Sequence, residues 1–264
     1  MTEASKNIIW LASYPKSGNT WFRAVLSNYF SEQDRAVSIN EFKSTPIASS
    51  RILFDESLGI SSSDLTQDEI DDLRISAYRS MSAETEGILF RKVHDAWKLT
   101  PSGNPLFPPD ITRAVVYIIR NPLDVAVSFS FHSGKSLEAI ISQMNNPSMS
   151  LCEKPEKLHN QLKQDLYNWS EHVNSWTIHS GLPVIVIRYE DLHSDPFNEF
   201  YKAFNFAGIE TDDERLKQAI AFSSFNVLST QEHQDGFRTA NKDGTILQRR
   251  KNRELEKTFF TQTC

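Results

Sequence analysis

Four short apolar runs, rich in β-branched and aromatic residues, stand out along the 264-residue chain and predict β-strands. These runs are Ile8–Ala12, Ile88–Val93, Ala114–Ile119 and Val184–Arg188. Each has apolar residues at both odd and even positions, which is typical of a parallel sheet covered by helices on both faces. We therefore expect the four strands to form the centre of an α/β protein.

Segments with helical periodicity separate the strands. The predicted helices are Thr20–Phe30, Leu65–Met81, Leu123–Phe131, Leu158–His179, Asn198–Ala207 and Asp213–Phe222. This alternation predicts a doubly wound domain, a three-layer α/β/α sandwich around a central parallel sheet. The polar stretch between Phe131 and Pro155 has little periodicity, and we expect a long surface excursion or a lid there.

The residues that follow the predicted strands carry most of the candidate chemistry. The segment Tyr14–Trp21 follows the first strand, Lys92 and His94 lie at the end of the second, and Arg120 and Tyr189 follow the third and fourth. Ligands of open parallel sheets bind at the carboxyl ends of the strands. Cations, an imidazole and a phosphate-loop-like turn are therefore expected to meet at one edge of the sheet.

The loop Tyr14–Trp21 (YPKSGNTW) joins the first strand to a helix. Gly18 permits a tight turn, the first amides of the helix would point at an anion, and Lys16 adds a positive charge. The alternative is a capped helix start with a solvated lysine. Lys16 precedes Gly18 and the first glycine of GxxxxGK[ST] is missing, so the Mg–nucleoside triphosphate site of a P-loop kinase is disfavoured.

A second candidate anion site follows the third strand. The segment Arg120–Ser128 (RNPLDVAVS) begins with an arginine, whose guanidinium can hold a phosphate through two hydrogen bonds. Pro122 suits the first turn of the next helix, and Ser128 would add a hydroxyl. The alternative is that Arg120 pairs with a nearby carboxylate such as Asp124. The residues alone leave this choice open.

These motifs resemble the sulfotransferases that use 3′-phosphoadenosine 5′-phosphosulfate (PAPS), in their soluble, cytosolic-type and bacterial branch. The YPKSGNTW loop resembles the family's 5′-phosphosulfate loop, and Arg120–His132 resembles its 3′-phosphate motif, RNPxDxxVSxxxH. Further segments match in the family's order along nearly the whole chain: Lys92-x-His94, Arg188–Leu192 (RYEDL) and Ser223–Phe225 (SSF).

The resemblance implies in-line transfer of a sulfuryl group from PAPS to a hydroxyl or amine of a small organic acceptor, without a metal. The product nucleotide would be 3′-phosphoadenosine 5′-phosphate (PAP). Lys16 and Lys92 would stabilise negative charge at the sulfuryl group and leaving phosphate, and His94 would be the general base. The implied nucleotide contacts are Lys16, Ser17, Gly18, Asn19 and Thr20 at the 5′-phosphate, Arg120 and Ser128 at the 3′-phosphate, and Trp21, Phe225, Tyr189 and Ser223 around the adenine.

The chain departs from the family near its C-terminus. The family has a basic, glycine-rich loop close to RKGxxGxWK there, whereas this sequence gives Arg249–Arg253 and then Glu254–Cys264 without those glycines. Residues 1–264 are therefore expected to form a single sulfotransferase-like domain with a truncated terminal loop. A degenerate PAP-binding protein without turnover is one alternative, and completion of the site by a partner chain is another.

Composition narrows the class further. The net charge of −6 at pH 7 argues against nucleic-acid binding through a broad basic surface. The two cysteines, Cys152 and Cys264, exclude a disulfide framework, and no apolar run approaches the roughly 20 residues of a membrane span. We expect a cytoplasmic protein that acts on a small molecule without membrane contact, and a homodimer is compatible with the sequence.

The remaining histidines and tryptophans show no spacing that points to chemistry. His172 and His179 lie two turns apart on a predicted helix and are expected on its surface. The tryptophans outside the phosphate loop are expected in the core or half-buried; they are Trp10, Trp97, Trp169 and Trp176.

Overall fold

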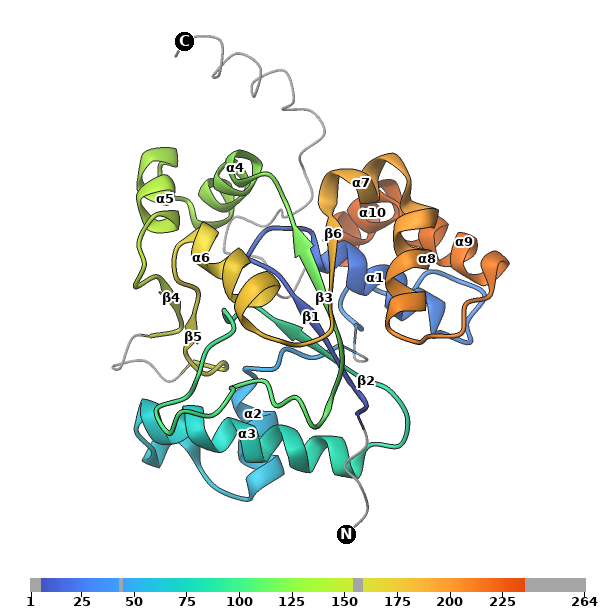
Figure 1. Ribbon diagram of the computed structural model, residues 1–264. Helices are drawn as coiled ribbons and strands as arrows, with labels where there is room; N and C mark the ends of the chain where they lie inside the picture. Colours follow the sequence, from blue (N-terminus) through green and yellow to red (C-terminus); the bar gives the residue numbers. More distant parts are fainter. Residues whose placement is uncertain (1–5, 43–44, 154–158, 236–264) are drawn as a thin grey trace.

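The computed structural model describes residues 6–42, 45–153 and 159–235. Its centre is a parallel sheet of four strands in the order β2-β1-β3-β6 (Figure 1). The strands are β1 (Ile8–Ala12), β2 (Leu89–Val93), β3 (Thr112–Ile119) and β6 (Val184–Arg188). The predicted α/β sandwich with a central parallel sheet is confirmed, and each predicted strand is present within two residues of its expected bounds.

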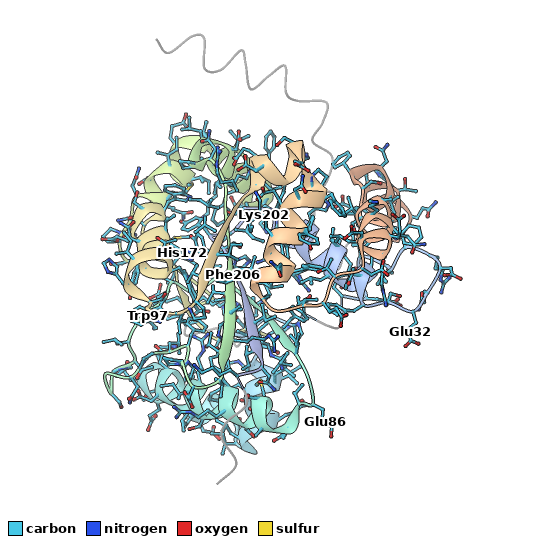
Figure 2. The ribbon with its side chains drawn as sticks, turned by 45° about the vertical axis from the view of Figure 1, so that its right-hand side comes forward. Glu32, Glu86, Trp97, His172, Lys202 and Phe206 are labelled. Carbon is cyan, nitrogen blue, oxygen red and sulfur yellow. The ribbon has the colours of Figure 1, made fainter. Side chains whose placement is uncertain are left out.

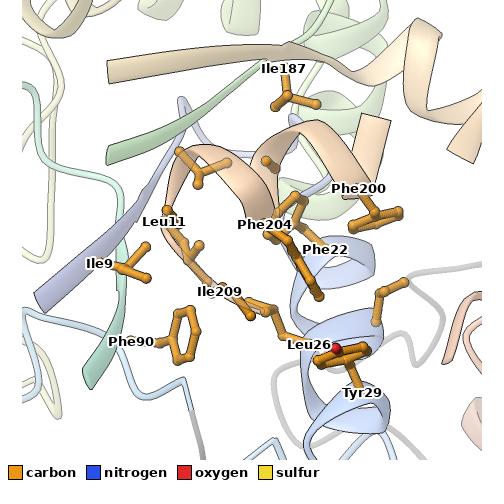
Figure 3. Close-up of a cluster of buried hydrophobic side chains, with 14 of the residues drawn as sticks. Ile9, Leu11, Phe22, Leu26, Tyr29, Phe90, Ile187, Phe200, Phe204 and Ile209 are labelled. Atoms are coloured by element: carbon orange, nitrogen blue, oxygen red, sulfur yellow. The ribbon is translucent and has the colours of Figure 1, made fainter. Parts of the chain in front are cut away.

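Alternation along β1 divides its side chains between two cores. Ile9 and Leu11 pack on one face of the sheet with α1 (Asn19–Tyr29), α8 (Pro196–Phe206) and α9 (Asp213–Phe222), as Figure 3 shows for part of this cluster. Ile8 and Trp10 pack on the other face with α2 (Arg51–Leu58), α3 (Gln67–Glu84) and the helix that carries Trp176. Both faces of the sheet are therefore buried, which explains why the strands are continuous apolar runs in the sequence.

Helix α1 forms because apolar residues recur on one face. Phe22, Val25, Leu26 and Tyr29 follow the i, i+3, i+4, i+7 spacing, and all four are buried in the core beside β1 and α8. Full burial of such a side chain contributes about 1.5–3 kcal/mol relative to exposure. This packing fixes the position of the helix N-terminus, which lies at the carboxyl edge of the sheet.

Two predictions about the middle of the chain are wrong in part. The expected excursion after Phe131 contains α5 (Leu137–Met144), which buries Ile140 and Met144 beside α4 (Pro122–Ser133). The hydrophobic spacing of α5 is regular, but it covers only two turns and is easily missed between polar residues. A short antiparallel pair, β4 (Ser150–Leu151) and β5 (Gln164–Asp165), completes this region.

The long helix predicted over Leu158–His179 does not form as such. Leu158 lies outside the described residues, and the helix begins only at α6 (Trp169–Asn174), where the Asn168 side chain caps it by accepting a hydrogen bond from the Glu171 amide. It continues as the π-helical turn η2 (Ser175–His179). The pairing of β5 with β4 holds the preceding residues in an extended conformation.

Three helical segments remain to be described. They are η1 (Ser62–Asp64), α7 (Tyr189–Ser194) and α10 (Phe225–Asp235). Helix α7 starts directly at the carboxyl end of β6, and α10 lies beside it in Figure 1. Within the described residues, no helix has both the length and the apolar character that a membrane span requires.

Candidate active site

The loop after β1 presents a helix N-terminus at the carboxyl edge of the sheet. Lys16 and Gly18 both have φ in the left-handed region, at 71° and 101°. The lysine is notable, since non-glycine residues rarely adopt this conformation and those that do are enriched at active sites. The Asn19 side chain donates to the Leu11 carbonyl (2.9 Å) and to Ser13 Oγ (3.3 Å), which ties the first turn of α1 to the end of β1.

The first amides of α1 have no acceptor within the helix, and they give this end a partial positive charge. Gly18 occupies the cap position without a side-chain hydrogen bond. Ser17 is buried, and its hydroxyl has no partner among the described residues. An anion at this point would satisfy these donors, with Lys16 and Thr20 beside it.

Gly18 is required by the packing of the loop against α7. A Cβ added at this residue would lie 2.3 Å from Cδ2 of Tyr189, far inside van der Waals contact. Tyr189 is the first residue after β6, so the phosphate loop and the end of the edge strand are in direct contact. The sequence prediction that Gly18 permits the turn is confirmed by its positive φ, and this close approach is a second reason for the glycine.

Arg120 lies at the end of β3 between the loop and Tyr189. Its guanidinium carbon sits 4.6 Å from the centre of the Tyr189 ring, and Nη1 donates to the Lys16 carbonyl at 3.3 Å. The buried Nε has no partner within the described part of the chain, and no ion pair with Asp124 is found there. Ser128 is buried two turns along α4. Arg120 therefore keeps donors available for an anion.

An apolar pocket of about 290 Å³ opens between α1, α7 and α10. All four residues predicted to surround an adenine line it: Trp21, Tyr189, Ser223 and Phe225. The Ser223 hydroxyl accepts from Asn28 (3.0 Å) and donates to the Ala219 carbonyl (2.8 Å), so this residue forms wall rather than offering a free hydroxyl. The sequence analysis brought together residues that are up to 204 positions apart in the chain.

His193 is a pocket residue that the sequence analysis missed. Its ring lies 5.0 Å from that of Trp21 and 4.9 Å from that of Tyr189, and its Nε2 is 3.0 Å from the Tyr189 hydroxyl. The spacing of four residues between Tyr189 and His193 would place them on one helical face. That signal is readable only once α7 is known to begin immediately after β6.

His94 is oriented by a hydrogen bond at one of its two ring nitrogens. Nδ1 lies 2.9 Å from the Ser13 carbonyl, which can only accept, so Nδ1 carries the proton and Nε2 keeps its lone pair. Nε2 has no partner within the residues that the structure describes. Burial, followed by the charge of Lys92, holds the pKa of His94 well below its usual range. The imidazole is therefore neutral at pH 7 and suited to accept a proton.

Lys92 lies on the α1 face of β2, because strand alternation places it with Phe90 in the core beside α1. Burial lowers its pKa to about 7, and the charges of Arg23 and Lys16 contribute in the same direction. No ion pair of Lys92 is found in the described residues. A desolvated ammonium without a carboxylate partner is a typical feature of an anion site.

The prediction that His172 lies on a helix surface is wrong. Its side chain is fully buried, Nε2 donates to the His94 carbonyl (3.0 Å) and Nδ1 accepts from the Tyr117 hydroxyl (2.8 Å). Burial lowers the pKa of His172 to about 4, so it is neutral and has a fixed tautomer. His172 therefore holds the backbone of the residue predicted to be the base.

The helical segment α6–η2 also forms hydrogen bonds with the residues that follow His94. Trp176 Nε1 donates to the Asp95 carbonyl, and the Trp97 amide donates to Ser175 Oγ, both at 3.0 Å (Figure 2 labels Trp97 and His172). Asp95 also forms a buried, bidentate pair with Arg74 at 2.8 and 3.0 Å. His172, Ser175 and Trp176 share one face of α6–η2 by their spacing, which is the signal that the sequence offered.

The structure thus brings the predicted residues to one edge of the sheet. Lys16, His94 and Arg120 follow three neighbouring strands, Lys92 lies near the end of β2, and the aromatic pocket adjoins them through Trp21. Their individual roles stay predictions. The terminal basic run, Arg249–Arg253, lies outside the described residues. Within those residues, no group of three acidic, histidine or cysteine side chains is placed to hold a metal ion.

This arrangement is typical of α/β proteins that bind phosphorylated ligands at the carboxyl edge of a parallel sheet. Comparison with known protein families matches residues 6–258 to the sulfotransferase domain. The chain belongs to this family, as the resemblance of its motifs implied.

Individual relatives are distant. A 3-beta-hydroxysteroid sulfotransferase of Cavia porcellus is 30% identical over 137 residues, which cover 48% of this chain and 43% of the relative. Luciferin sulfotransferase of Photinus pyralis is 23% identical over 237 residues, which cover 83% of this chain and 56% of the relative. The chain spans about a third to just over half of the length of the curated relatives it matches.

Solved structures share the fold. A mouse sulfotransferase complexed with PAP superposes with a TM-score of 0.53 at 20% identity, covering 86% of this chain and 67% of the other. Retinol dehydratase in complex with androsterone and the inactive cofactor PAP gives 0.56 at 18% identity, covering 92% and 73%. At this level of identity the likeness establishes a common architecture.

Proposed function

We propose that this protein transfers a sulfuryl group from PAPS to a hydroxyl or amine of a small organic acceptor. One observation supports this most: the helix N-terminus of α1, Arg120 and the aromatic pocket lined by Trp21 adjoin one another at the sheet edge, and Nε of Arg120 has no partner in the described residues. A nucleotide with a 5′-phosphate, a 3′-phosphate and a base would match these two anion sites and the aromatic pocket.

The residues fit an in-line displacement. The donor supplies the activated sulfuryl group, and negative charge builds on the phosphate that leaves. Lys16 and the first amides of α1 would stabilise that charge, and Lys92 would hold the sulfuryl oxygens. His94 would take the proton of the acceptor through Nε2, since Nδ1 is committed to Ser13.

Calorimetric titration with PAP tests the donor site. We expect micromolar or tighter binding, and no comparable binding of Mg–ATP, because the loop lacks the P-loop order. An acceptor screen with radiolabelled PAPS would then follow. Binding without transfer to any hydroxyl or amine would favour the degenerate PAP-binding alternative. A folded protein that fails to bind PAP would contradict the proposal.

Arg120→Ala tests the assigned 3′-phosphate contact. We expect PAP affinity to fall by about tenfold or more, because a hydrogen bond to a charged group contributes roughly 1.5–3 kcal/mol. Adenosine 5′-phosphosulfate has no 3′-phosphate, so its affinity should change much less. Parallel titrations with the two ligands measure the difference, and equal losses would reject this contact.

Several finer features belong to this proposal. We propose a single domain over residues 1–264, a location in the cytoplasm, and a small-molecule acceptor without nucleic-acid or membrane contact. A homodimer is also compatible with it. Size-exclusion chromatography with light scattering measures the assembly. Donor binding by the full chain decides whether its C-terminal sequence supports a complete nucleotide site.

A further inference from the structure

Arg23 is a cation at the site that no matched motif includes. It lies on α1, partly buried, and its Nε donates to Thr45 Oγ1 at 2.7 Å while its guanidinium carbon lies 5.6 Å from the Phe42 ring centre. Thr45 is completely buried. The two terminal nitrogens of Arg23 have no partner in the described part of the chain and are not enclosed by it. Four N–H donors are therefore available.

The neighbours of Arg23 place it beside the predicted catalytic residues. Thr45 begins a segment that pairs with the end of β2: the Lys92 amide donates to the Pro46 carbonyl (3.0 Å), and the Ala48 amide donates to the Lys92 carbonyl (2.8 Å). The side chain of Lys92 points to the α1 face of the sheet. Arg23 and Lys92 thus face the same space from the helix and the strand.

The charges in this space are unbalanced. Burial lowers the pKa of Arg23 to about 10, and the charge of Arg23 contributes to the lowered pKa values of Lys92 and His94. No ion pair of Arg23 or Lys92 is found among the described residues. Adjacent cations without a counter-charge are costly to desolvate, and a bound anion would remove that cost.

Arg23 lies on a different side of α1 from the proposed nucleotide pocket. Trp21 lines the adenine pocket, and two residues further along α1 correspond to a rotation of about 200° around the helix axis. Arg23 is also one turn beyond Asn19, so it is separated from the phosphate loop along the helix. Its hydrogen bond to Thr45 directs it to the segment after Thr45, and the Phe42 ring that it faces packs beside Leu228 of α10.

We propose that Arg23, which lies beside Lys92, forms an anion subsite for the acceptor, and that the acceptor is a hydroxy compound carrying an acidic group such as a carboxylate. The inference rests on the proposed function, since it names the substrate class of that reaction. The acid group pairs with the guanidinium, and the hydroxyl is directed to His94. Arg23 would then determine acceptor specificity.

Paired ligands test the subsite by binding, independently of turnover. The PAP-saturated protein is titrated with 4-hydroxyphenylacetate and with its neutral amide, 4-hydroxyphenylacetamide. We expect the acid to bind about tenfold more tightly. Arg23→Gln should bring this ratio close to one, and Arg23→Lys should retain part of it because the charge remains. Arg215→Gln, at an exposed arginine of α9, should keep the ratio.

The outcomes separate this inference from the proposed function. Equal binding of acid and amide to the PAP-saturated wild type overturns the subsite and leaves the donor site in place. An unchanged ratio in Arg23→Gln also overturns it, and a simultaneous loss of PAP affinity would assign Arg23 to the donor instead. If the wild type does not bind PAP at all, the proposed function fails first and the inference fails with it.

Discussion

Replacing His94 by alanine is expected to lower kcat by about 10²–10⁴ while leaving PAP affinity within about twofold, because general-base catalysis contributes on this order. Within the described residues Nε2 of His94 has no hydrogen-bond partner and Nδ1 carries the proton, so Nε2 is the atom that would accept the proton of the acceptor hydroxyl. The measurement is transfer of label from PAPS to the acceptor found by screening, with PAP titration in parallel.

The matched control is His179→Ala, since His179 is exposed at the end of η2. It should leave both kcat and PAP affinity unchanged. The pH profile gives a second check. Burial keeps the pKa of His94 well below its usual range, so the wild-type rate should stay level as the pH falls through 6.5. An alanine variant that keeps more than a tenth of the wild-type rate would remove His94 from the base role.

The sheet and the phosphate loop were predictable because their sequence signals are local. A strand buried on both faces, such as Ile8–Ala12, must be apolar throughout. A turn that needs a positive φ, as at position 18, favours a glycine. Helices with a regular apolar face were recovered for the same reason. The weakest prediction, Leu158–His179, failed where Asn168 caps a helix and cross-strand pairing precedes it.

The residues that were missed depend on contacts between distant segments. His172 is an ordinary helix residue in sequence, and only the packing of α6–η2 against the loop after β2 brings it to the His94 carbonyl. Arg23 becomes notable through Thr45 and Lys92, which come from two other parts of the chain. Arg23 has no local pattern that separates it from a surface residue, and the only local signal for His172 is that it shares a helical face with Trp176. Tertiary packing supplies that information.

Donor affinity is expected to fall about tenfold per pH unit above pH 7 because of Lys92. In the free protein, burial and the nearby cations lower the pKa of Lys92 to about 7. A bound anion favours the ammonium form, so the pKa rises in the complex. Binding is therefore strongest below pH 7, where Lys92 is already charged, and it weakens between pH 7 and the raised pKa of the complex.

Titrations with PAPS between pH 6 and 9 measure this slope, and calorimetry in buffers of different ionisation enthalpy measures the proton taken up. Lys92→Arg should flatten the slope, because a guanidinium stays charged throughout this range. Lys98→Arg is the matched control: Lys98 pairs with Asp71 and Asp165, which help to hold its pKa above the usual value, so the wild-type slope should persist. An unchanged slope in Lys92→Arg would assign the proton to another group. A flat wild-type profile would mean that Lys92 does not meet the donor's negative charge, and the sulfuryl contact assigned to it would have to be given up.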